Sequence, residues 1–157
     1  MTEMSKIVRT VTNMIFPLIM IFGLYVIAHG HLTPGGGFQG GAVAASGLAL
    51  LLVAYGSPWV FERIKEKHLS MFESIGAVWF IVVALLGLAF GSVFFLNFLV
   101  GTPVFGNIPQ FGATVADLNT GGVLPLMNFA VGLKVIAGLF VVVLVMAFAS
   151  NWKEGKP

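Results

Sequence analysis

The sequence predicts an all-α integral membrane protein with four transmembrane helices and both chain ends on the cytoplasmic side. Three observations predict this class. Of the residues, 58% are hydrophobic. Only 9% are charged, whereas ordinary soluble domains carry roughly 25% charged residues. The few charges are also spaced so that four long apolar runs remain, and about 20 apolar residues are enough for a helix to cross a bilayer.

The four expected spans cover residues 11–28, 38–60, 74–100 and 124–150. The first follows two basic residues, Lys6 and Arg9, as the apolar part of a signal peptide would. It is longer than that part usually is and ends without a convincing small-residue cleavage site, so we interpret it as a span. No linker or internal repeat divides the chain, which predicts one membrane domain over residues 1–157.

The positions of the basic residues predict the orientation, because Lys and Arg collect on the cytoplasmic side. All but Lys134 lie before the first span, between the second and third, or after the fourth. We therefore expect a multi-pass protein of the cell (plasma) membrane, with residues 29–41 and the loop 101–120 outside. The basic pI of about 9.2 reflects this topology, since no basic face with interleaved aromatic residues predicts nucleic-acid binding.

A glycine-rich segment, His-Gly-His-Leu-Thr-Pro-Gly-Gly-Gly-Phe-Gln-Gly-Gly, occupies positions 29–41 between the first two spans. It lacks the Gly-Lys-Ser/Thr ending and the preceding strand of a phosphate-binding loop. We predict that Thr33 caps the second helix and that Pro34 takes its first position. Small residues spaced by four then predict a tight turn and close helix packing: Gly35, Gly36, Gly37, Gly40 and Gly41. The alternative is a direct role in an ion pathway, with Gln39 as its polar group.

Lys134 lies near the middle of the fourth span, where an ammonium group costs about 2.5 to 3.5 kcal/mol on insertion scales. Ala130 and Gly138 are small, so another helix could approach the lysine closely. Because Glu73 is expected at the membrane edge and Asp117 in the outer loop, the predicted partner is another chain or trapped water. Lys134 is then either a proton or cation relay, or a structural lysine that snorkels or pairs within a complex.

Glu73 closes the tetrapeptide Ser-Met-Phe-Glu, which matches a capping box that begins at Ser70 and predicts the start of the third helix. Its carboxylate is either this cap or a member of an ion path. His29 and His31 flank a glycine at the outer surface, where two imidazoles without a third ligand make a weak metal site. Interfacial anchoring or proton access are the other interpretations of this pair, and no metal is expected.

The residues also limit the chemistry of this chain. There is no cysteine, which excludes disulfides, thiolate metal sites and iron–sulfur ligation. No nucleophile with a base, paired carboxylates or metal set can be assembled, so we expect no enzymatic activity and no cofactor in this chain.

Residues 30–41, followed by an alanine-rich helix, resemble the signature of the MnhB/MrpB family. The likeness continues through the charged turn to Gly132-Leu133-Lys134-Val135 in the fourth span. It implies the B subunit of an Mrp-type Na⁺/H⁺ antiporter, or of a related membrane-bound hydrogenase or respiratory complex. In such hetero-oligomers the other Mrp-type membrane subunits are the partners, and Na⁺ and H⁺ are the transported ions.

Under this interpretation the candidate ion-pathway residues are Lys134, Glu73, Gln39 and His31. The alternative is a purely structural scaffold that packs neighbouring subunits through its small-residue groove. An independent four-helix channel is disfavoured, because one lysine without an internal partner makes a poor transport path.

Overall fold

The computed structural model describes residues 4–106 and 120–153, with side chains described up to residue 150. Over these residues the chain is helical and has no strand. The five helices are α1 (Lys6–Ala28), α2 (Gly37–Tyr55), α3 (Ser57–Arg63), α4 (Glu66–Gly91) and α5 (Leu124–Lys153). All except the short α3 are long and apolar enough to cross a membrane. The predicted all-α, four-span class is therefore confirmed.

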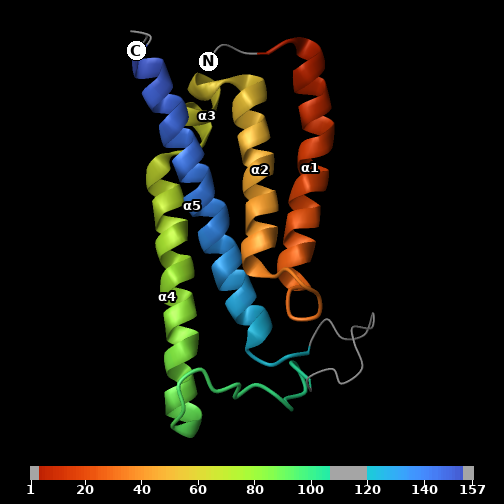
Figure 1. Ribbon diagram of the computed structural model, residues 1–157, viewed down its shortest axis with the longest axis vertical. Helices are drawn as coiled ribbons and strands as arrows, with labels where there is room; N and C mark the ends of the chain where they lie inside the picture. Colours follow the sequence, from red (N-terminus) through yellow and green to blue (C-terminus); the bar gives the residue numbers. More distant parts are fainter. Residues whose placement is uncertain (1–3, 107–119, 154–157) are drawn as a thin grey trace.

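The four long helices pack in the order α1, α2, α5, α4 (Figure 1). Both ends of the described chain lie at one end of the bundle, and the turn between α1 and α2 lies at the other. Helix α4 is displaced along the bundle axis, so that its last turns extend well beyond that turn (Figure 1). Which side of the membrane carries the chain ends stays a prediction.

Helix α2 ends earlier than the predicted span 38–60, because the chain breaks at Gly56. Gly56 adopts φ +80°, a left-handed conformation that glycine tolerates best. Two residues later, Pro58 has no N–H to donate to the carbonyl of Ala54. The backbone N–H of Met4 takes that place, at 3.1 Å from the Ala54 oxygen. Met4 thus completes the end of α2.

The third span is the main correction to the predicted boundaries, since α4 covers Glu66–Gly91 and not residues 74–100. The helix ends where Ser92 turns left-handed, with φ 62°. The chain then folds back along α4, and Phe95 donates its N–H to the carbonyl of Ala84 at 3.3 Å. The apolar residues after Gly91 therefore cover α4 and do not lengthen it. Most of the predicted outer loop 101–120 lies outside the described residues.

Asn97 joins this returning segment to the beginning of α5. Its side-chain nitrogen donates to the carbonyl of Gly121 at 2.9 Å, and its side-chain oxygen accepts the N–H of Val123 at 2.8 Å. Toward the chain ends, α5 packs against Leu52 of α2, Val60 of α3 and Leu69 of α4 in one buried cluster, to which it contributes Phe140, Leu144 and Ala147. Helix α5 is therefore anchored at both ends, which positions the charged residue between them.

Candidate functional site

An ion pair between α4 and α5 is the central feature of the site. The Nζ atom of Lys134 lies 3.3 Å from Oε1 of Glu73, close enough for a charge-assisted hydrogen bond. The sequence predicts that another chain or trapped water pairs with Lys134. That prediction is wrong, because a carboxylate of the same chain, that of Glu73, pairs with it. Glu73 of α4 therefore lies at the same depth in the bundle as Lys134 of α5.

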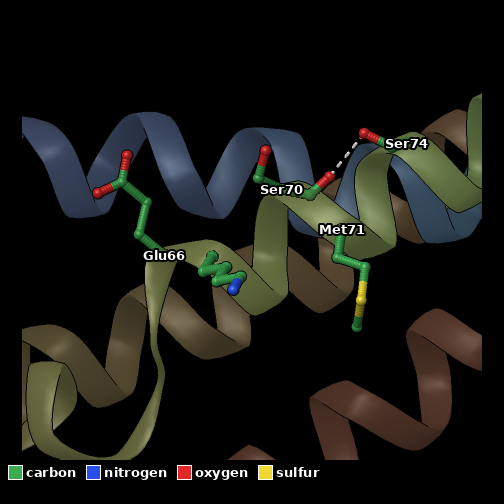
Figure 2. Close-up of a pocket in the computed structure, with 5 residues that line it drawn as sticks. Glu66, Ser70, Met71 and Ser74 are labelled. Atoms are coloured by element: carbon green, nitrogen blue, oxygen red, sulfur yellow. Dashed lines mark hydrogen bonds between the residues drawn. The ribbon is translucent and has the colours of Figure 1, made fainter.

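Glu73 does not cap a helix. Helix α4 begins at Glu66, and seven residues of α-helix place Glu73 about 10 Å inside it. The predicted capping box fails for the same reason, since Ser70 is an interior residue whose carbonyl accepts the hydroxyl of Ser74 at 2.9 Å (Figure 2). Of the charged turn between the second and third predicted spans, Glu66, Lys67 and His68 form the first turn of α4.

Two glycines lie beside the ion pair, and the first of them lets the helices approach closely. A Cβ atom at position 76 would lie 2.7 Å from the carbonyl oxygen of Ala130, nearer than real Cβ atoms come to other heavy atoms. Gly138 faces Glu73, where a Cβ atom would lie at an ordinary 3.5 Å from the carboxylate carbon. Gly76 was not singled out from the sequence. A glycine one turn from each charged residue, within an apolar span, is the signal that identifies this contact.

The ion pair lies open to one side of the chain. The side chain of Lys134 is 49% exposed and that of Glu73 is 39% exposed. Beside the lysine runs an apolar groove of about 510 Å³, bounded by Phe38, Gly76, Phe80, Ala130, Val131 and Lys134. A second hollow of about 520 Å³ lies along one face of α4 near its start, where Figure 2 shows Glu66, Ser70, Met71 and Ser74. The first groove alone reaches the ion pair.

The hairpin between α1 and α2 departs from the predicted caps. Helix α2 begins at Gly37 with Gly36 as its N-cap, so Thr33 and Pro34 precede it. The Thr33 hydroxyl donates backward, to the carbonyl of His29 at 3.3 Å. Gly35 and Gly36 have φ of +148° and +98°, and glycine is the residue that enters such conformations freely. The start of α2 is therefore set by Gly35 and Gly36, and not by Thr33 as the cap and Pro34 as the first residue, as the sequence predicted.

Helix α2 contacts both of its neighbours through glycine. A Cβ atom at position 40 would lie 2.6 Å from the carbonyl oxygen of Gly23 in α1, and one at position 41 would lie 2.8 Å from Cβ of Val135 in α5. Gly37 lies directly on the backbone carbonyl of Asn128. These contacts place the start of α2 one turn of α5 away from Lys134.

The other candidate ion-pathway residues lie apart from the ion pair. His31 stays at the turn, where its Nε2 is 3.4 Å from the hydroxyl of Thr120. The neighbouring His29 stacks on Tyr25 with ring centroids 5.0 Å apart. Gln39 is exposed on α2. Among the described residues, no three His, Cys, Asp or Glu side chains gather as a metal site would require.

This all-helical, four-span fold with an ion pair inside the membrane region defines a multi-pass membrane protein. The family described as a domain related to the MnhB subunit of the Na⁺/H⁺ antiporter matches residues 7–151. The chain belongs to this MnhB family, which confirms the family predicted from residues 30–41.

Two relatives and one solved structure add detail. The chain is 35% identical over 139 residues to an uncharacterized protein of Methanocaldococcus jannaschii, an alignment that covers 87% of this chain and 50% of that protein. It is 30% identical over 120 residues to a Staphylococcus aureus protein named as antiporter subunit mnhB2, covering 75% of this chain and 84% of the relative. The chain thus spans half the length of the archaeal relative.

The solved structure is a chain of the membrane-bound sulfane sulfur reductase, an archaeal respiratory membrane complex. The two folds superpose with a TM-score of 0.74 at 30% identity. The match covers 93% of this chain and 59% of that chain. The chain is therefore similar both to a chain of a respiratory membrane complex and to a protein named as an antiporter subunit.

Proposed function

We propose that this chain is a non-catalytic membrane subunit of a multisubunit sodium/proton-translocating complex, and that Glu73 and Lys134 help form its cation pathway. The observation that carries the proposal is the ion pair between α4 and α5, 3.3 Å apart and open to one side. The family supports it, because it is described by its relation to a Na⁺/H⁺ antiporter subunit.

Membrane physics explains why this pair calls for a function. Ionisable residues inside spans are costly and mark ion paths or proton relays in many membrane proteins. Mutual pairing neutralises the two charges, but about half of the lysine side chain and more than a third of the glutamate side chain stay exposed. Hydrocarbon offers no hydrogen bonds to these atoms. A neighbouring subunit or a water-filled passage therefore covers the open side.

The two side chains have complementary chemistry for cation exchange. The Glu73 carboxylate can accept a proton or ligate Na⁺, which prefers oxygen atoms. The Lys134 ammonium group competes for the same carboxylate at 3.3 Å, so a cation binds only when Lys134 swings away or loses its proton. The pair thus alternates between an internal salt bridge and a cation-loaded carboxylate.

The test uses two substitutions that keep the size of each side chain, Glu73→Gln and Lys134→Met. Membrane vesicles that contain the whole complex are assayed for sodium-dependent proton exchange, and native gels report assembly. We expect assembled complexes with strongly reduced exchange. Normal exchange in both assembled variants would contradict a role in the pathway.

A second candidate is a pure scaffold. The small-residue groove expected to pack neighbouring subunits is occupied by this chain itself, since Gly37, Gly40 and Gly41 are buried against α1 and α5. The scaffold function predicts that Gly37→Leu, which collides with the backbone at Asn128, removes the complex from native gels while Lys134→Met leaves assembly and transport intact. Mass spectrometry of the purified complex then separates a stand-alone antiporter from a redox-driven pump, because only the latter contains redox subunits.

A further inference from the structure

A row of four side chains lies at the end of the bundle that holds the chain ends, away from the ion pair. Arg63 lies over the ring of Trp59, with its Cζ atom 4.1 Å from the ring centroid. Trp59 stacks on Tyr55 at 4.4 Å between centroids. Arg9 lies over the other aromatic ring, with Cζ 6.0 Å from the centroid of Tyr55. We name these four residues the cation–aromatic row.

The row is built by the break between α2 and α3. Tyr55 is the last residue of α2 and Trp59 lies in α3, and the positive φ of Gly56 turns the chain between them. The Tyr55 hydroxyl donates to Asn13 of α1 at 2.7 Å, one turn along α1 from Arg9. Three helices therefore fix the two rings, and the arginines lie at the two ends of the row.

We propose that the cation–aromatic row binds the phosphate group of an anionic phospholipid. A guanidinium whose face lies on an aromatic ring keeps its N–H donors at its edges, where they match two oxygens of one phosphate. The Arg63 side chain is 53% exposed, and its Nη1 atom makes two long contacts, to Oε2 of Glu62 at 3.8 Å and to the carbonyl oxygen of Trp59 at 3.5 Å. Long contacts at an exposed position are worth little, so Arg63 can offer its N–H donors to a phosphate.

Position and charge select a lipid as the source of the phosphate. Tyr and Trp concentrate where spans meet the headgroups, and the row lies where α1 begins and α2 ends. Basic residues dominate this end among the described residues: Lys6, Arg9, Arg63, Lys65 and Lys67 against Glu62 and Glu66. The charge distribution predicts that this end is cytoplasmic, and that leaflet carries the negative surface potential. The inference is independent of the ion pathway.

The test follows Trp59 fluorescence in the full-length chain. The chain has three tryptophans, so Trp79→Phe with Trp152→Phe leaves Trp59 as the only reporter. The protein is placed in phosphatidylcholine nanodiscs to which one spin-labelled lipid is added, either phosphatidylglycerol or phosphatidylcholine. In both labelled lipids the nitroxide is attached to one acyl chain, close to the headgroup. We expect stronger quenching by the anionic lipid, and about a ten-fold or greater loss of that preference for each arginine replaced by Gln, from the usual strength of a hydrogen bond to a charged group.

Matched variants distinguish a specific phosphate site from the general attraction of basic residues to an anionic membrane surface. Lys65→Gln with Lys67→Gln removes the same charge from the same end and is expected to cost less of the preference, at most about five-fold for each lysine, the contribution of one basic residue at an anionic surface. Arg9→Lys with Arg63→Lys keeps the charge but removes the planar donors, and is expected to weaken the preference. An equal loss in the Lys65/Lys67 variant, or no preference for phosphatidylglycerol, would overturn the proposal. Far-ultraviolet circular dichroism checks that each variant is folded.

Two further arms identify the occupant. Inorganic phosphate added to phosphatidylcholine nanodiscs is expected to leave Trp59 unchanged, and an effect as large as that of the lipid would assign the site to free phosphate. Mass spectrometry of the assembled complex is expected to show less bound phosphatidylglycerol in the Arg9→Gln/Arg63→Gln variant. Loss of a neighbouring subunit, with the lipid retained, would make the row a protein contact and refute the lipid site.

Discussion

Gly76 of α4 lies directly against the backbone of Ala130 in α5, so closely that a Cβ atom at position 76 would be 2.7 Å from the Ala130 carbonyl oxygen. The contact is made one turn from Glu73, and it brings Glu73 and Lys134 within reach of each other. Backbone atoms cannot yield as a flexible side chain can. A methyl group at this position must therefore push the two helices apart.

We accordingly expect Gly76→Ala to destabilise the chain and to disrupt the ion pair. Overpacking of this kind costs about 1 to 3 kcal/mol, which exceeds the gain of up to about 1 kcal/mol when alanine replaces glycine in a helix. Gly138→Ala is the matched control, since its Cβ would lie at an ordinary 3.5 Å from the Glu73 carboxylate carbon. Thermal unfolding in detergent should rank Gly138→Ala at or above the native chain and Gly76→Ala below it. The reverse order would contradict the contact.

The same comparison applies to the pairing of α1 with α2. A Cβ atom at position 40 would lie 2.6 Å from the carbonyl oxygen of Gly23, whereas one at position 47 would meet only side-chain atoms of Ile19 and Met20, the nearest at 3.1 Å. We expect Gly40→Ala to lower the unfolding temperature markedly and Gly47→Ala to change it little. Disulfide trapping between cysteines placed on α1 and α2 would report the separation directly. Equal effects of the two substitutions would show that helix propensity, and not packing, decides.

How much the sequence predicts depends on the range of the interaction concerned. The four spans follow from hydrophobic runs, which are local, and the family follows from residues 30–41. The start of α4 cannot be predicted from a hydrophobic run, because the first turn of this helix is charged. The pairing of Glu73 with Lys134 depends on the axial register of α4 against α5. That register is set by Gly76 and by the fold-back of the chain after Ser92, which no local pattern reveals.

The predicted start of α2 was wrong for a different reason. Thr33 and Pro34 are residues typical of a helix start, but Gly35 and Gly36 place the chain in left-handed conformations after them. The helix can begin only once these two residues are passed. Thr and Pro do favour the start of a helix, but the backbone conformation of Gly35 and Gly36 overrides that preference here.

The N-terminal segment gives a third prediction. The Met4 N–H donates to the carbonyl of Ala54 at 3.1 Å. Ala54 is fully buried, and the residue that would donate to its carbonyl within a helix is Pro58, which has no N–H. Met4→Pro removes the donor and leaves the carbonyl unsatisfied, which costs about 1 to 3 kcal/mol. Met4→Leu keeps the N–H and serves as the control. Guanidinium or thermal unfolding should separate the two variants, and equal stability would show that water replaces Met4.

Asn97 offers a fourth prediction, because one side chain makes two hydrogen bonds to the start of α5. Asn97→Ala removes the bond to the Gly121 carbonyl and the bond from the Val123 N–H. Two net bonds of about 1 kcal/mol each suggest a loss of about 2 kcal/mol. Asn97→Asp keeps the acceptor for Val123 but turns the donor toward Gly121 into a second acceptor, so we expect no rescue. Hydrogen exchange at the first amides of α5 is the measurement, and unchanged protection in Asn97→Ala would refute the clamp.

A double-mutant comparison tests whether Glu73 and Lys134 act as a pair in the folded chain. Replacing one partner leaves the other charge uncompensated within the membrane region, whereas replacing both removes the problem. We therefore expect Lys134→Met and Glu73→Gln each to lower the unfolding temperature, and the double variant to be more stable than either single variant. Additive losses would show that the two side chains do not interact, since coupled neighbours depart from additivity. Because the double variant restores stability without restoring a titratable carboxylate, it should remain inactive in sodium-dependent proton exchange. Stability and transport can then be assigned to separate properties of the same two residues.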